Sequence, residues 1–273
     1  MKLHATSMLI ATVGVLLIGA SVWAQNTDTD TSSSEPRYGQ EGKDVVWVPT
    51  ADSLVARMLD MAEATPDDVL VDLGSGDGRT VIAAARRGVP ARGIEYNPEL
   101  VEVSRRAAEK AGVTDLARFE EGDIFESDFS EATVVTLFLL PALNLRLRPI
   151  LLDMKPGTRV VSNSFDMGEW QPDDQVEAEQ SACQTWCRAY KWVVPAKVDG
   201  RWRMDGGELV LRQTFQMLEG TLRSEGRAVE LSEARMHGAR IRFSADGRDY
   251  VGKVSGDTMR GTIDGDTPWS ATR

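Results

Sequence analysis

One stretch, VLVDLGSGDGR at residues 69–79, constrains the fold of this chain more than any other. It opens on the apolar, β-branched run Val69–Val71, which is typical of a buried parallel strand. Asp72 follows this run, and a glycine-rich loop then leads into Thr80–Arg87, a segment of helix-forming residues. Strand, glycine loop and helix in this order indicate the first nucleotide-binding unit of a doubly wound α/β sheet.

Glycines occupy alternate positions of this loop, at Gly74, Gly76 and Gly78. Because glycine has no side chain, the loop backbone can approach a ligand closely, and its amides at a helix N-terminus favour anionic groups. The spacing G-x-G-x-G behind an aspartate differs from the dinucleotide fingerprint G-x-G-x-x-G. It is the form found in S-adenosylmethionine (SAM) methyltransferases. An ordinary tight loop is the alternative that the glycines alone leave open.

Acidic residues follow the next two predicted strands. The strand Ala91–Ile94 ends on Glu95, 21 positions beyond the first loop glycine, where nucleotide sites place the acid that binds ribose hydroxyls. A third strand over Ala117–Glu120 is followed by Asp123–Ile124, in which the carboxylate suits an adenine amino group and the apolar neighbour suits the ring. The carboxyl ends of parallel strands share one sheet edge, so these residues are predicted to converge on one ligand.

The remaining elements of this sheet follow from apolar runs and the residues that break them. A leading helix is expected over Ala51–Ala64 with Thr50 as its cap, and Asn97 is expected to cap a helix that runs to Ala111. The other expected elements are a strand over Thr133–Leu140, a helix over Ala142–Met154, a strand over Arg159–Asn163, and a final hairpin of Gln175–Cys183 and Cys187–Pro195.

The pattern changes from Lys197 onward. Short alternating runs between Glu208 and Ile263 are separated by turns at roughly 8–12-residue spacing, which indicates an antiparallel meander, a curled sheet or a small barrel. The expected organisation is therefore α/β: a Rossmann-like domain over residues 44–196 and a small C-terminal antiparallel β module over residues 197–273. No chemical constellation is visible in the module, so a stabilising or partner-binding role is expected for it.

The N-terminus resembles a secretory signal. Met1–Ala24 has a basic start at Lys2, an apolar run over Met8–Val22, and small residues before a cleavage point. The polar segment over residues 25–43 is expected to be a disordered linker. The predicted location is periplasmic or in the cell envelope. A retained segment would make the protein membrane-anchored, and otherwise no transmembrane span is expected in the mature chain.

Charge and residue counts exclude several classes of function. The chain has 42 acidic and 31 basic residues and a net charge of −11, which disfavours nucleic acid as a partner because a phosphate backbone would be repelled. The two histidines, His4 and His237, are too few for a histidine metal cluster and lie far apart in the sequence. No metal site and no Ser-His-Asp triad are therefore expected.

The two cysteines, Cys183 and Cys187, flank a three-residue link between two predicted strands. Cross-strand partners can lie close enough to bridge, so a disulfide is expected if the chain is exported. Two free or buried thiols are the alternative, because a four-residue separation is also ordinary on a helix.

Six segments in this order carry a family resemblance: WVPT (47–50), DLGSGDGR (72–79), GIEYNPELV (93–101), EGDIFE (121–126), ATVVTLFLLPALNLRLRP (132–149) and FDMGEW (165–170). They resemble a bacterial group of class I SAM-dependent methyltransferases that is related to the mitochondrial protein-lysine methyltransferases acting on the ATP synthase c-subunit. The glycine segment is specific for the superfamily, whereas VPT and LLPALN point to the narrower group. The resemblance spans the region from Val45 to Pro195.

This resemblance implies a class I methyltransferase sheet, SAM as the cofactor and methyl transfer to a protein substrate, most simply a lysine. The expected cofactor-binding residues are Thr50, Asp72, Gly74, Ser75, Gly76, Gly78, Glu95, Asp123 and Ile124. The expected substrate rim, whose aromatic rings could hold a cationic amine, comprises Trp47, Leu140, Pro141, Phe165 and Trp170. No catalytic residue is identified. Asp166 is a candidate base, but an aspartate in such a position more often caps a loop.

Two other classes of function remain open at this point. A nicotinamide-dependent oxidoreductase could use a similar sheet, but the glycine spacing disfavours it. An exported protein that binds SAM or a nucleotide without turnover is compatible with the predicted compartment and with the β module. Titration with SAM and with NAD distinguishes these alternatives.

Overall fold

The computed structural model describes residues 37–40, 46–179 and 181–273. The predicted signal over residues 1–24 and most of the predicted linker over residues 25–43 lie outside the described residues. Within the described part of the chain, none of the helices combines the length and the apolar character that crossing a membrane requires.

The first sheet has seven strands in the order β3-β2-β1-β4-β5-β7-β6. Neighbours among the first five strands are parallel, whereas β7 runs antiparallel to both β5 and β6, so the sheet is mixed and Rossmann-like. The strand order reverses beside β1, at the switch point where open α/β sheets bind ligands. The strands are β1 Leu70–Leu73, β2 Ala91–Glu95, β3 Ala117–Glu121, β4 Val134–Leu137, β5 Arg159–Asn163, β6 Asp174–Glu177 and β7 Arg188–Val193.

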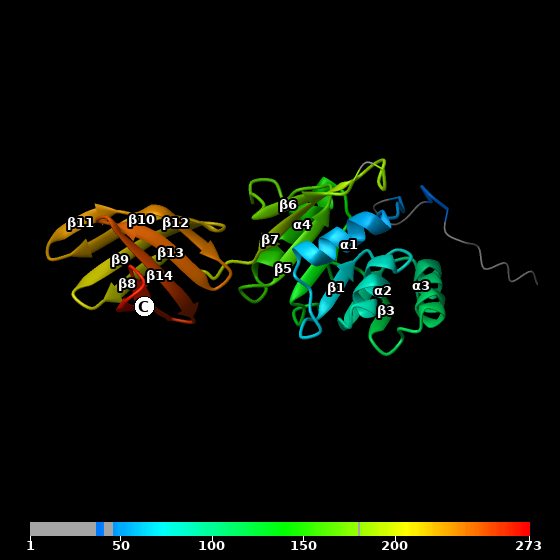
Figure 1. The fold of residues 1–273 in the computed structure, drawn as a ribbon, viewed down its shortest axis with the longest axis horizontal. Coiled ribbons are helices and arrows are strands. Elements are labelled where there is room, and N and C mark those ends of the chain that lie inside the picture. Colours follow the sequence, from blue (N-terminus) through cyan, green and yellow to red (C-terminus); the bar gives the residue numbers. More distant parts are fainter. Residues whose placement is uncertain (1–36, 41–45, 180) are drawn as a thin grey trace, which may run out of the picture. The chain divides into compact units, whose positions relative to one another are not determined.

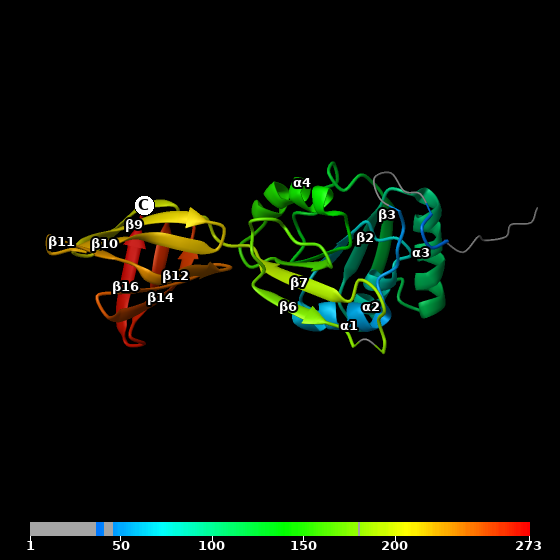
Figure 2. The same ribbon diagram turned by 90° about the horizontal axis from the view of Figure 1, so that it is seen from above.

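Helices cover both faces of this sheet: α1 Asp52–Met61, α2 Arg79–Arg86, α3 Pro98–Ala111 and α4 Pro141–Leu152. Figure 2 shows α4 on the opposite side of the sheet from α1 and α2. The strands alternate their side chains between two cores. Leu70 and Val134 pack with residues of α1 and α2, whereas Val71 and Val135 pack with Leu147 of α4.

Two predictions about local structure can be checked at the helix starts. The predicted cap of α3 is confirmed, because the Asn97 side chain accepts a hydrogen bond from the Glu99 amide at 2.9 Å. The predicted cap of α1 by Thr50 is wrong. This helix begins at Asp52 without a side-chain cap, and the Thr50 hydroxyl instead accepts from the Asn163 amide at 3.1 Å. The contact to β5 has taken the side chain that local pattern assigned to the helix.

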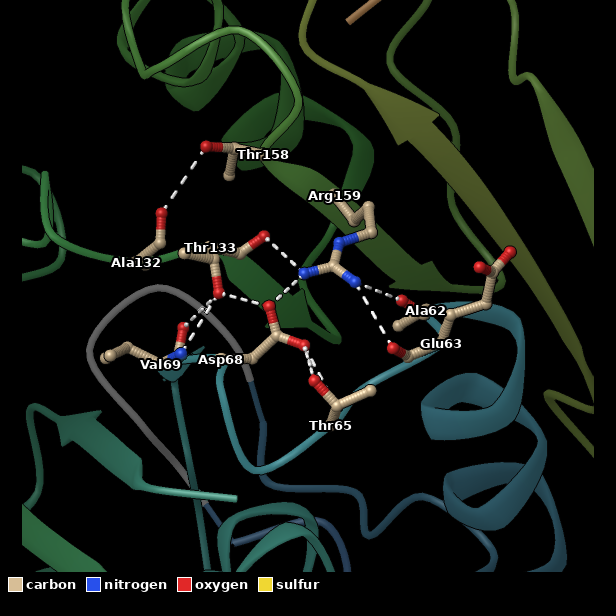
Figure 3. Close-up of polar contacts among 9 residues, drawn as sticks. All are labelled: Ala62, Glu63, Thr65, Asp68, Val69, Ala132, Thr133, Thr158 and Arg159. Carbon is tan, nitrogen blue, oxygen red and sulfur yellow. Dashed lines mark hydrogen bonds and ion pairs between the residues drawn. The ribbon is translucent and has the colours of Figure 1, made fainter.

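A buried ion pair ties α1 to the amino-terminal ends of three strands (Figure 3). Asp68, just before β1, accepts from the Thr133 hydroxyl at 2.7 Å and from the Thr65 amide at 2.9 Å, and it pairs with Arg159 at the start of β5. Arg159 also donates to the Ala62 carbonyl at 2.9 Å, at the end of α1. Burial alone would raise the pKa of the Asp68 carboxyl, but these hydrogen bonds and Arg159 lower it.

The C-terminal part is a closed antiparallel barrel of eight strands, and is therefore larger than the small module expected from the sequence (Figure 1). The barrel closes because β9 pairs with both β8 and β10, and β11 (Arg227–Glu230) adds a short strand beside β10. The barrel strands are β8 Gly200–Met204, β9 Gly207–Thr214, β10 Met217–Ser224, β12 Ser232–His237, β13 Arg240–Ala245, β14 Arg248–Ser255, β15 Thr258–Ile263 and β16 Thr267–Thr272.

The sequence did not reveal three of these barrel strands, β8, β12 and β16. Each has polar residues on its outer face and few large residues inside, chiefly Trp202, Met236 and Trp269, so alternation is hard to recognise. The barrel interior is nevertheless packed with side chains from all three. The predicted domain boundary at residue 196 falls in the connection between β7 and β8.

Candidate functional site

A cavity of about 570 Å³ lies at the carboxyl edge of the first sheet. It extends over the ends of β1, β2 and β4 and the loop after β3. Eight of the nine expected cofactor-binding residues line it: Thr50, Asp72, Gly74, Ser75, Gly76, Glu95, Asp123 and Ile124. Residues that are up to 74 positions apart in the sequence, from Thr50 to Ile124, are therefore brought to one site by the strand order.

The glycine loop is held against β2 and lies under an indole ring. The amides of Gly74 and Ser75 both donate to the Ile94 carbonyl, at 2.8 and 3.1 Å. At Gly76, φ is +56°, and a Cβ atom would lie 2.5 Å from the indole nitrogen of Trp47. Glycine is therefore required at this position both by the backbone conformation and by the closeness of Trp47.

Gly78 is the one expected cofactor residue that does not line the cavity. It precedes α2 with φ +80°, and a Cβ atom there would lie 2.7 Å from the Phe119 ring and 2.9 Å from Ser104. The third glycine therefore allows α2 to pack closely against α3 and β3. Pattern alone could not separate this packing role from a ligand-binding role.

Glu95 is fixed at the end of β2 by two backbone amides. One carboxylate oxygen accepts from the Gly76 amide and the other from the Asn97 amide, both at 2.9 Å. Asp123 is oriented in a similar way, since it accepts from the Phe125 amide at 2.9 Å. Both carboxylates are therefore held in place where they line the cavity.

Asp72 lies at the end of β1 and is 6% exposed. Burial raises the pKa of its carboxyl to about 7, and the carboxylates of Glu95 and Asp77 push the pKa in the same direction. Hydrogen bonds from two threonines lower the pKa but do not outweigh burial, although the Thr136 hydroxyl donates at 2.6 Å. This group therefore changes its charge near neutral pH.

The cavity lining is acidic on balance. Four carboxylates, from Asp72, Asp77, Glu95 and Asp123, face one arginine, Arg79. Arg79 pairs with Asp77 at 2.6 Å and donates to the Thr50 carbonyl at 2.8 Å, which ties the segment before α1 to the glycine loop. Arg79 ends the segment DLGSGDGR, but local pattern alone assigns it no role.

The expected substrate rim is only partly at the cavity. Trp47, Leu140 and Phe165 line it, whereas Pro141 does not and is instead the exposed first residue of α4. The assignment of Trp170 to the rim is wrong. Its side chain is fully buried, its ring lies 6.0 Å from that of Trp192, and its carbonyl accepts from the Trp192 indole at 2.7 Å.

Asp166, the candidate base, also does not line the cavity. Its carboxylate accepts from the Gly168 amide at 3.0 Å, as a residue that caps a loop does. The lining contains neither histidine nor lysine. Among the described lining residues, nothing is therefore arranged as a dedicated base.

Three aromatic rings form one wall of the cavity: Phe138, Phe165 and Trp186. The ring centroids lie 6.2 Å apart for Phe138 and Phe165, 6.2 Å for Phe138 and Trp186, and 5.2 Å for Phe165 and Trp186. Sequence reasoning missed two of them. The apolar pattern places Phe138 inside a strand, but β4 ends at Leu137 and Phe138 follows it at the site.

Trp186 lies in the loop between β6 and β7, between two bridged cysteines. Cys183 and Cys187 form a disulfide with an S–S distance of 2.06 Å and a Cα–Cα distance of 5.7 Å. The signal for Trp186 was present in the sequence as the link Gln184–Trp186 between the cysteines, but nothing local shows which way such a link points.

Comparison with known proteins adds a family to this geometry. Residues 72–174 match the family described as ANTKMT methyltransferase domain. The chain is 45% identical over 138 residues to a protein-lysine N-methyltransferase of Saccharolobus islandicus, which covers 50% of this chain and 86% of that protein. It is 44% identical over 105 residues to the Mus musculus lysine N-methyltransferase of the ATP synthase c-subunit, which covers 38% of this chain and 42% of that protein.

A solved structure is also similar. The crystal structure of an RNA methyltransferase from Salinibacter ruber in complex with S-adenosyl-L-homocysteine is 51% identical, with a TM-score of 0.52. The alignment covers 55% of this chain and 96% of that one. The matched part in each comparison leaves much of this chain, including a stretch as long as the barrel, without a counterpart.

Proposed function

This chain belongs to the SAM-dependent protein-lysine N-methyltransferases of the ANTKMT type, and from that membership we propose that the cavity at the carboxyl edge of its first sheet holds both SAM and the acceptor lysine. SAM, when bound, supplies an electrophilic methyl group on a positively charged sulfur. The observation that carries the proposal is the convergence of acidic side chains from three successive strand ends on one cavity.

The residues present fit this cofactor. Glu95, whose two oxygens are already fixed by amides, retains lone pairs that would accept the ribose hydroxyls. Asp123 would accept from the adenine amino group, with Ile124 against the ring. Asp72 would face the positive charge of the methionine part. The Ser75 hydroxyl is buried without a hydrogen-bond partner among the described residues, and it lies on the cavity wall.

Positioning and exclusion of water are the main contributions expected from this chain. Methyl transfer is an in-line displacement, which needs an aligned acceptor more than it needs acid–base help. A lysine must however lose its proton first. The aromatic and aliphatic wall around Phe138, Phe165 and Leu140 would lower the pKa of an incoming amine by desolvation, so water could take the proton.

The acceptor is a protein lysine, and we propose that it lies in a basic segment of a protein in the cell envelope. The net charge of −11 and the four lining carboxylates would attract a basic polypeptide and repel RNA. The disulfide supports export, because such bridges persist in oxidising compartments. The leader-like sequence of residues 1–24 supports it as well.

Labelling tests the acceptor class. The purified protein is incubated with methyl-labelled SAM and an envelope extract, and label is then measured in protein, RNA and organic-soluble fractions. We expect methyl-lysine in protein hydrolysates for the wild type and for Glu99→Ala, a matched control whose carboxylate is exposed in the first turn of α3. Glu95→Ala should lose most of the label. Label confined to RNA or to the organic-soluble fraction would contradict the proposal.

A further inference from the structure

Trp186 combines exposure with an unfavourable backbone conformation. Its φ is +59° and its residue surface is 45% exposed. A bulky residue rarely adopts the left-handed region, which costs about 1–3 kcal/mol and persists only where the surroundings impose it. An exposed indole gains little from burial to offset that cost, so the conformation calls for another reason.

The neighbouring disulfide imposes this conformation. Cys183 is 4% exposed and packs in the core that includes residues of α1, and Cys187 packs against the same core. The adjacent Ala182 carbonyl accepts from the Ser53 hydroxyl of α1 at 3.1 Å. Both ends of the five-residue loop are therefore anchored, and Trp186 is directed to the cavity.

Phe165, the partner of Trp186 in the aromatic wall, is also held on a constrained loop. It follows Ser164, whose φ is +61°, and its carbonyl accepts from the Asn144 side chain at 3.1 Å. The Ser164 amide donates to the Arg188 carbonyl at 2.7 Å, which joins this loop to the start of β7. Two strained loops therefore meet, and the contact between their rings is 5.2 Å from centroid to centroid.

The aromatic wall lies on the acceptor half of the cavity. Its rings follow β4, β5 and β6, whereas the carboxylates proposed for SAM follow β1, β2 and β3. In the sheet order, β2 and β3 lie on one side of β1, and β4, β5 and β6 lie on the other. Aromatic faces attract an alkylammonium group and also pack against its methylene chain.

We propose that Trp186 binds the acceptor lysine side chain and that the Cys183–Cys187 disulfide is the positioning element that presents it, so that acceptor binding depends on the oxidised state of the bridge. This inference rests on the proposed function, since it assigns the acceptor side of the same cavity. Reduction by a dithiol would transfer two electrons and two protons to the bridge, giving two thiols and a cyclic disulfide. The loop would then relax from the left-handed conformation.

Steady-state kinetics with poly-L-lysine as the acceptor test the role of Trp186. For Trp186→Ala we expect the acceptor KM to rise about 5–30-fold, while the SAM Kd from calorimetry changes less than about twofold. Trp186→Phe should restore most of the affinity, because it keeps an aromatic face. The double variant Cys183→Ser/Cys187→Ser should raise KM in the same way. Met217→Ala, an exposed apolar residue of the barrel, is the control.

Binding tests the same inference without turnover. The seven tryptophans are labelled with 5-fluorotryptophan, and the ¹⁹F resonance missing from Trp186→Phe identifies Trp186. With S-adenosyl-L-homocysteine present, Nα-acetyl-lysine methylamide should move this resonance, whereas its Nε-acetylated form should not. Reduced protein should show no such shift.

The outcomes separate the two proposals. A Trp186 resonance that does not respond to the lysine compound, or a Trp186→Ala variant with the wild-type KM, would overturn the inference and leave the methyltransferase function intact. A wild-type protein that neither binds SAM nor methylates any lysine would instead overturn the proposed function. A disulfide variant with unchanged KM but weaker SAM binding would place the loop on the cofactor side and refute the positioning role.

Discussion

The raised pKa of Asp72 predicts that SAM binding depends on pH. The carboxyl has a pKa of about 7 because it is buried at the end of β1. SAM carries a positive sulfonium, so the ionised form of Asp72 should bind it and the protonated form should not. Affinity is therefore expected to rise as pH increases through 7 and then to level off.

The magnitude of this effect follows from the titration. With a pKa of about 7, roughly one tenth of the groups are ionised at pH 6 and roughly nine tenths at pH 8. If only the ionised form binds, the affinity should increase about 10-fold over this range, which corresponds to about 1.4 kcal/mol. Burial also has a cost: folding raises this pKa from 3.8, so the contribution of Asp72 to folding stability falls as pH rises from about 4 to 7.

Calorimetry at a series of pH values measures this dependence. S-adenosyl-L-homocysteine, which lacks the sulfonium charge, should show a weaker pH dependence, and Asp72→Asn should flatten the profile for SAM. Equal pH profiles for SAM in the wild type and in Asp72→Asn would refute the reasoning. An affinity that falls between pH 6 and 8 in the wild type alone would refute it as well.

Three further predictions concern the loop, the ion pair and the disulfide. Gly76→Ala should weaken SAM binding at least about 10-fold because its Cβ meets Trp47, whereas Gly112→Ala, also at positive φ but with no neighbour within 4 Å, should not, as calorimetry can show. Asp68→Ala should lower the unfolding free energy by about 2–4 kcal/mol in urea, against less than about 1 kcal/mol for the exposed Glu102→Ala, and the contribution of Asp68 should be lost as pH falls below 3.8. Mass spectrometry of unreduced protein from the native compartment should find Cys183 and Cys187 bridged; two thiols that alkylate without reduction would contradict this.

Local sequence pattern was enough to locate the cofactor side of the site. The acids at Asp72, Glu95 and Asp123 directly follow apolar strands, and parallel strands bring their carboxyl ends to one edge. Gly78 shows the limit of the pattern. Its spacing matches the other two glycines, but its role depends on Phe119, which is 41 positions away in the sequence.

The acceptor side could not be located in the same way, because it depends on loops that local pattern does not orient. Trp170 and Trp186 are both tryptophans near the ends of strands, and only tertiary packing decides between them. Trp170 is drawn into the core beside Trp192, whereas the disulfide directs Trp186 to the cavity. The size of the barrel escaped prediction for a similar reason, since its closure depends on the pairing of β9 with β10 and β8 at once.

Calorimetric titration of SAM into the wild type, Glu95→Ala and Glu99→Ala tests most directly whether this cavity is the cofactor site. We predict one SAM per chain for the wild type and for Glu99→Ala with similar affinities. Glu95→Ala should bind about 5–150-fold more weakly, because ribose hydroxyls left without their acceptor cost about 1–3 kcal/mol. The same affinity in all three proteins would contradict the assignment of SAM to this cavity.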